Sequence, residues 1–228
     1  MPVAGVDACP GGWYVAVWDP LGALLEGSVC RDFQSVLEYT SACAMIGIDI
    51  PIGLAERGSR TCDGLARRLL RGKASSVFPA PIRPILAASS QREASAIKRR
   101  IDGQGVGAQA FAFVAKVRQV DDLITPALHG RVVEVHPELC FLTLNGGDPV
   151  LEKKRQPEGF ERRRRLLKAV LPEFDALVEA RPRRVGADDV LDALVAAWTA
   201  TRVFDDRAEW IPDEPPVDAK GLRMEMWY

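Results

Sequence analysis

Short apolar runs, broken by turns rich in glycine and proline, dominate the first fifty residues. Three β-type runs come first, at residues 3–7, 13–18 and 24–29. Their spacing predicts a meander of two consecutive hairpins. A helix is expected over 32–39, with Asp32 as its N-cap. The nearly continuous apolar run 44–50 predicts a strand buried on both faces, and the helix crossover before it favours parallel pairing.

The remainder of the chain is mainly helical in pattern. Residues 55–128 are rich in alanine, arginine and leucine and contain no comparable buried run, which indicates a largely helical insertion. A further buried strand is predicted at 131–135. The apolar spacing over 188–204 predicts a long final helix, with Asp188 or Asp189 as its N-cap.

This order of elements predicts one α/β domain over residues 1–228. Three antiparallel strands join two parallel ones in a five-stranded mixed sheet flanked by helices. The mainly helical insertion at 55–128 separates strands four and five. That layout is typical of a ribonuclease-H-like domain. The apolar tail 221–228 is expected to pack back onto this body.

Composition places the chain among globular proteins of the cytoplasm. Of 228 residues, 47% are hydrophobic and 27% charged. No apolar run reaches the roughly 18 residues that span a bilayer, and no basic stretch leads into an apolar one at the N-terminus. The five cysteines are irregularly spaced without a CxxC pair, which favours reduced thiols over a disulfide framework or a zinc site.

Charge is balanced overall but unevenly distributed. A net charge of -1 argues against a protein that coats nucleic acid generally. Residues 1–56 hold seven acids and one base, whereas 57–101 hold eleven bases and two acids, and 152–168 hold eight bases and three acids. An acidic core with basic attachments suits an enzyme that cleaves a polyphosphate chain. Solvated helix faces are the alternative interpretation of each basic cluster.

Acidic residues stand at the ends of predicted elements. Asp7 closes the first strand, Asp49 the fourth and Glu134 the fifth, while Asp189 and Asp192 share one face of the last helix. If strands one and four are neighbours, Asp7 and Asp49 meet at their carboxyl ends, where open sheets bind ligands. The final helix could lay Asp192 over the same point. An aspartate at such a position is also an ordinary turn former or cap.

Clustered carboxylates repel one another unless a cation lies between them. Oxygen donors, in a chain with only two histidines, suit Mg²⁺ or Mn²⁺ rather than zinc. Two such ions can activate a water and stabilise the leaving oxygen in phosphodiester cleavage. His136, which precedes Pro137, is interpreted as a structural histidine.

Motifs over nearly the whole chain resemble those of a family of predicted nucleases with a ribonuclease-H-like fold, catalogued as a domain of unknown function. They are GVD at 5–7, PGGW at 10–13, GIDIPIGL at 47–54, RTCD at 60–63, SSVFP at 75–79, EVHPE at 134–138 and DDVLDA at 188–193. The last helix also resembles that of RuvC-type resolvases, which carry acids three residues apart. The resemblance implies the catalytic residues Asp7, Asp49, Glu134 and Asp192. It implies the metal ligands Asp7, Asp49, Asp189 and Asp192.

The leading hypothesis is a nuclease dependent on Mg²⁺ or Mn²⁺ that acts on DNA or RNA. Basic residues of the insertion would then contact phosphate, namely Arg60, Arg67, Lys116 and Arg118. One alternative is an ATP-binding phosphotransferase of related actin-like topology, with a phosphate loop at 10–12, although such enzymes use two domains. The other is a nucleic-acid-binding module without catalysis. No membrane partner is expected, and the sequence leaves a homodimer open.

Overall fold

A mixed five-stranded sheet organises the computed structural model, which describes residues 1–21, 24–171 and 173–228. The strands lie in the order β3-β2-β1-β4-β5. Their bounds are β1 Val3–Cys9, β2 Gly12–Asp19, β3 Leu24–Cys30, β4 Ile46–Ile48 and β5 Val132–Glu134. β2 runs antiparallel to β1 and β3, and β4 runs parallel to β1 and β5. The predicted α/β fold, with its mixed sheet and flanking helices, is therefore confirmed.

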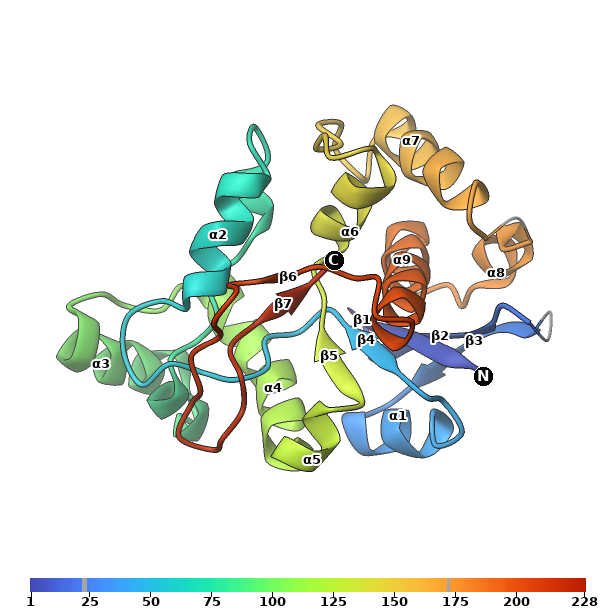
Figure 1. Ribbon diagram of the computed structural model, residues 1–228. Helices are drawn as coiled ribbons and strands as arrows, with labels where there is room; N and C mark the ends of the chain where they lie inside the picture. Colours follow the sequence, from blue (N-terminus) through green and yellow to red (C-terminus); the bar gives the residue numbers. More distant parts are fainter. Residues whose placement is uncertain (22–23, 172) are drawn as a thin grey trace.

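Helices cover both faces of this sheet. Helix α9 (Ala187–Phe204) lies across one face with α6 (Pro137–Leu144), α7 (Pro157–Lys168) and α8 (Asp175–Ala180), while α1 (Phe33–Tyr39) lies on the other (Figure 1). Two clusters of buried apolar side chains fill the spaces between the sheet and these layers. Asp32 caps α1 as predicted, since its carboxylate accepts a hydrogen bond from Ser35 N–H.

The segment between β4 and β5 folds mainly as helices. They are α2 (Thr61–Leu69), the 3-10 turns η1 (Ala74–Ser76) and η2 (Arg83–Ala87), α3 (Gln91–Asp102), α4 (Ala108–Leu123) and α5 (Pro126–His129). Helix α4 packs under the sheet beside α1, whereas α2 and α3 extend away from it (Figure 1). The C-terminal tail forms a two-stranded ribbon of β6 (Trp210–Ile211) and β7 (Met226–Trp227) beside β5. The tail thus packs onto the body as expected.

Two glycines let α9 approach the sheet closely. A Cβ at Gly5 would lie 1.9 Å from the carbonyl oxygen of Ala193, and one at Gly47 would lie 2.7 Å from that of Ala196. Because side chains alternate along a strand, the next positions with the same orientation are Asp7 and Asp49. The strand period therefore directs both carboxylates toward α9.

Two local predictions are wrong. The strand predicted at 44–50 is only three residues long, Ile46–Ile48. The last helix begins at Ala187 with Gly186 as its N-cap, so neither predicted aspartate takes that position. Asp189 lies in the first turn instead, where its carboxylate accepts a hydrogen bond from the Gly186 N–H at 2.9 Å.

Two findings bear on the surroundings of the chain. All five cysteines are buried free thiols. Within the three described ranges, no helix has both the length and the apolar character needed to cross a membrane.

Candidate functional site

Three aspartates from separate elements converge at the carboxyl edge of the parallel strands. Asp7 lies near the end of β1, Asp49 directly follows β4, and Asp192 lies in α9. Val6 pairs with Ile48 across the two strands, which places Asp7 beside Asp49. The three side chains line one cavity of about 710 Å³. The prediction of this convergence rested on the strand ends, on the helix spacing and on the assumption that the first and fourth strands are neighbours, which the sheet order confirms.

The cluster concentrates negative charge away from water. Burial, together with the charges of Asp192 and Asp49, raises the pKa of Asp7 well above its ordinary value. Burial also raises the pKa of Asp49 and of Asp192, against the lowering effect of the nearby Lys154 ammonium. Such carboxylates favour a cation between them, because a cation compensates both their lost hydration and their mutual repulsion.

Lys154 supplies positive charge to this cluster. Its Nζ hydrogen-bonds to Asp192 Oδ2 and lies 3.7 Å from Asp188 Oδ2. The next residue, Arg155, pairs with Asp188 at 3.1 Å. Sequence reasoning did not single out Lys154. The basic run at 152–168 was its only signal, and that run does not distinguish a lysine inside the site from one in solvent.

Asp189 lies one turn of α9 before Asp192 and lines the same cavity. One of its carboxylate oxygens is engaged by the Gly186 N–H, as a helix cap. Burial raises the pKa of Asp189 as well. Its predicted role as a metal ligand therefore competes with a role at the start of the helix.

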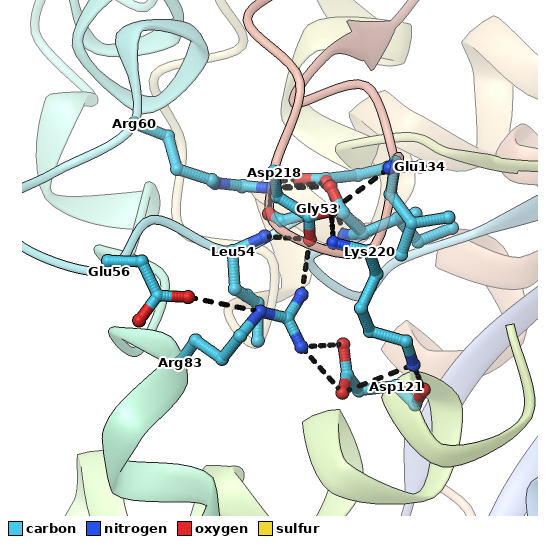
Figure 2. A network of polar contacts seen from close by, with 11 residues as sticks. Gly53, Leu54, Glu56, Arg60, Arg83, Asp121, Glu134, Asp218 and Lys220 are labelled. Atoms are coloured by element: carbon cyan, nitrogen blue, oxygen red, sulfur yellow. Dashed lines mark hydrogen bonds and ion pairs between the residues drawn. The ribbon is translucent and has the colours of Figure 1, made fainter. Parts of the chain in front are cut away.

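Glu134 lines the same cavity as the three aspartates but leaves the sheet on the opposite face from Asp49. It pairs with Ile48, so its side chain shares the face of Ile48, whereas Asp49 points to the opposite one. Its carboxylate receives Arg60 in a bidentate ion pair at 2.6 and 2.7 Å and accepts the Ile52 N–H at 2.7 Å (Figure 2). Burial raises the pKa of Glu134 to about 7, while Arg60 limits that rise. These contacts indicate a residue that positions the loop after β4.

Arg60 was predicted to contact substrate phosphate, but its surroundings in the fold differ from those of an exposed phosphate-binding residue. It is buried, and besides Glu134 it bonds Asp63 at 2.6 Å and the carbonyl groups of Ile52 and Gly53. Its donors are thus directed into the fold. The physical reason is the pair of buried carboxylates, which a guanidinium fork satisfies at once.

The other three predicted phosphate contacts also have partners within the fold. Arg67 donates to the Val77 carbonyl at 2.8 and 3.1 Å, and Lys116 donates to Gly12 O at 2.6 Å. Arg118 donates to two carbonyl groups of the segment 86–88. Each predicted phosphate contact would therefore have to break or share these hydrogen bonds.

Two further residues of the EVHPE motif line the cavity. The carboxylate of Glu138 accepts a hydrogen bond from Arg163 Nη2 at 2.7 Å, and its other oxygen lies 3.3 Å from Lys73 Nζ. His136 Nε2 lies 3.4 Å from the carbonyl oxygen of Ser76, and burial lowers the pKa of its imidazole ring. Its Nδ1 is buried without a hydrogen-bond partner among the described residues. The sequence motif contains Glu138 but does not indicate its pairing with Arg163 and Lys73.

The chemistry of these oxygen donors suits a hard divalent cation, whereas the donors lie further apart than the ligands of a bound ion. Carboxylate oxygens are the ligands that Mg²⁺ and Mn²⁺ prefer. In the parts of the chain that the structure describes, no three histidine, cysteine, aspartate or glutamate side chains are gathered closely enough to hold an ion. Asp7, Asp49 and Asp192 are the candidate ligands, and the Lys154 ammonium already contacts one of them.

The turn of the first hairpin is tied to the fold. A Cβ at Gly12 would lie 2.0 Å from the Cys30 carbonyl oxygen, and the Gly12 carbonyl accepts Lys116. Gly12 thus packs tightly against the end of β3, whereas Gly11 in the same turn is exposed and an added Cβ there would meet nothing within 4 Å.

Comparison with known proteins identifies a family. A family described as "Protein of unknown function (DUF429)" matches residues 5–217. Searches of curated proteins and of solved structures find no match.

Proposed function

Because the chain belongs to the DUF429 family, whose description specifies no activity, we propose from the site itself a hydrolase of nucleic-acid phosphodiester bonds that depends on a divalent cation. The observation that carries the proposal is the convergence of Asp7, Asp49 and Asp192 in one cavity. Three buried carboxylates without a matching set of cations are costly, so their placement favours a function that uses them.

Asp7, Asp49 and Asp192 would hold Mg²⁺ or Mn²⁺. When bound, such an ion activates a water molecule and stabilises the leaving oxygen of a phosphodiester. The chain's own contribution is to fix the three carboxylates on rigid elements, namely two strands of the sheet and α9. Helix α9 packs directly against β1, which holds Asp192 over the end of that strand.

Basic residues at the rim of the cavity are the candidate contacts for the substrate backbone. Lys153 and Arg155 are exposed and line the same cavity as the aspartates. Phosphate groups carry the charge that such residues bind, and they do so without regard to base sequence. We therefore assign the first contact with phosphate to these two residues in place of Arg60.

The test is cleavage of labelled oligonucleotides by the purified protein with Mn²⁺. The panel comprises single-stranded DNA and RNA, an RNA–DNA hybrid and a branched duplex. Asp7→Asn should lower kcat/KM at least about a hundredfold, because a carboxamide is a poor ligand for a hard cation. EDTA should abolish cleavage. Asp122→Asn, at an exposed position of α4, is the matched control and should retain full activity.

Cleavage that persists in EDTA, or that survives Asp7→Asn, would overturn the assignment. Thermal unfolding of each variant reports whether it is folded. The asparagine variant should be at least as stable as the parent protein without metal, because it removes one of several repelling buried charges. Tight binding of the oligonucleotides without any cleavage would favour the non-catalytic binding module instead.

A further inference from the structure

A short loop carries Lys154 into the carboxylate cluster. Residues 145–156 connect α6 to α7 without a helix or strand of their own. Lys154 Nζ bonds Asp192 from the end of this loop, and its charge also acts on Asp7 and Asp49. A lysine from a connecting loop thus contributes the charge that a metal ion would bring.

The middle of the loop is anchored through the carbonyl groups of Val150 and Glu152. Lys73 Nζ donates to the carbonyl groups of Val150 and Glu152, both at 2.8 Å. Arg163 Nη1 donates to the Glu152 carbonyl at 3.0 Å. Both cations also pair with the buried carboxylate of Glu138. The backbone immediately before Lys154 is therefore held in place by a buried ionic cluster.

Lys153, directly before Lys154, is held by close packing with α7. A Cβ at Gly159 would lie 2.2 Å from the carbonyl oxygen of Lys153, so only glycine allows this approach. The loop backbone is thus fixed up to Lys153, whereas the Lys154 side chain remains 36% exposed. Its flexible stem can therefore leave the cluster without any movement of the backbone.

We propose that Lys154 is a built-in cation that holds the carboxylate cluster together when no metal is present, and that a divalent cation binds by displacing it. The inference rests on the proposed function, since it concerns the same three aspartates. A divalent ion offers two positive charges where the ammonium offers one, so it compensates the three carboxylates more completely. The released ammonium is then free to meet the phosphate of a substrate entering the same cavity.

The exchange has two measurable consequences. Without metal, loss of the Lys154 charge leaves the buried aspartates uncompensated, and the folded state is destabilised. With metal, loss of the competing ammonium strengthens binding. Both effects are read from binding and unfolding, independently of catalysis.

The experiment compares the parent protein with Lys154→Met, which removes the charge but keeps an unbranched side chain. Lys168→Met is the matched control, because Lys168 is 40% exposed and pairs with Asp175 at 2.5 Å, away from the site. Mn²⁺ alone is titrated by calorimetry, and Tm is measured in EDTA and in excess Mn²⁺. Lys154→Met should bind Mn²⁺ at least tenfold more tightly. Its Tm should fall by about 5 °C or more in EDTA and recover in Mn²⁺.

The outcomes separate the two proposals. If the parent protein binds Mn²⁺ and Lys154→Met binds it equally or more weakly, the exchange is wrong and the metal site stands. If neither protein binds Mn²⁺, the proposed function falls and the exchange falls with it. Should Lys154→Met fail to fold in EDTA, refolding on addition of Mn²⁺ supports the exchange. Failure to fold in both conditions overturns it.

Discussion

Gly5 sets the distance between the sheet and α9. A side chain there would meet backbone atoms of α9, at 1.9 Å from Ala193 O and 2.2 Å from Ala197 N. Backbone cannot rotate aside as a flexible side chain can, so the helix as a whole would have to move. Because the same helix carries Asp192, the smallest residue in β1 also positions one of the candidate ligands.

Gly5→Ala should therefore destabilise the fold by about 3 kcal/mol or more, as expected for overpacking that the core cannot relieve. Gly64→Ala is the matched control. Gly64 is an exposed position of α2 where an added Cβ meets nothing within 4 Å. Alanine there should stabilise the protein by about 0.5–1 kcal/mol through helix propensity. Urea unfolding measures both, and equal effects of the two substitutions would contradict the close approach of α9.

The contrast between Asp49 and Glu134 shows what strand ends alone can predict. Both follow a buried apolar run, and both were predicted to be catalytic. Only register against β4 reveals that Glu134 shares the face of Ile48. The face of the sheet that Glu134 takes depends on how β5 pairs with β4, a strand more than eighty residues earlier in the chain. The hydrophobic pattern of β5 alone does not specify that pairing.

At the scale of a single element, helix α1 depends on its N-cap, Asp32. It is only seven residues long, and Asp32 accepts hydrogen bonds from both the N–H and the hydroxyl of Ser35, at 2.8 and 2.6 Å. A short helix has few internal hydrogen bonds, so its first turn contributes a large share of its stability. The sequence predicted this cap because Asp32 directly precedes the apolar-periodic segment.

Asp32→Ala should lower Tm by roughly 2–4 °C, whereas Asp32→Asn should change it little, because asparagine is an equally good cap. The hydrogen bonds from Ser35 lower the pKa of Asp32 in the folded state. The ionised cap thus stabilises the protein above the pKa of an unfolded aspartate, and this contribution disappears as pH falls through the folded pKa. The difference between Asp32→Ala and the parent protein should shrink in acid. A difference that stays constant down to pH 2 would contradict an ionised cap.

At the scale of the whole molecule, polar contacts determine how the insertion and the C-terminal tail attach. Arg83, in η2, bonds both oxygens of Asp121 in α4, at 3.0 and 2.9 Å, and also bonds Asp218 of the tail (Figure 2). Asp218 in turn accepts the Leu54 N–H at 3.0 Å, on the loop that begins at Asp49. One guanidinium thus joins three segments that are distant in sequence.

The sheet was predictable from the sequence, while this attachment was not. Hydrophobic period and turn residues determine β1 to β5, because each strand must bury its own apolar positions. The partners of Arg83 lie 38 and 135 residues away, and an arginine within a basic stretch carries no local mark of which carboxylate it will meet. For the same reason, Lys154 was not recognised as part of the site.

Arg83→Met should cost about 3 kcal/mol, because it leaves the fully buried carboxylate of Asp218 without its cation. Arg207→Met is the control: its pair with Asp205 is more than 40% exposed on both sides and should contribute less than about 1 kcal/mol. Hydrogen exchange should quicken at the Leu54 amide in Arg83→Met, since that amide donates to Asp218. If Asp218 stays ordered through its backbone donors alone, both variants will unfold at the same urea concentration, and the proposed role of Arg83 in joining the three segments is wrong.

The Mn²⁺ affinity of Arg83→Met should stay within about threefold of the parent value, because the three aspartates are held by the sheet and α9 and not by this network.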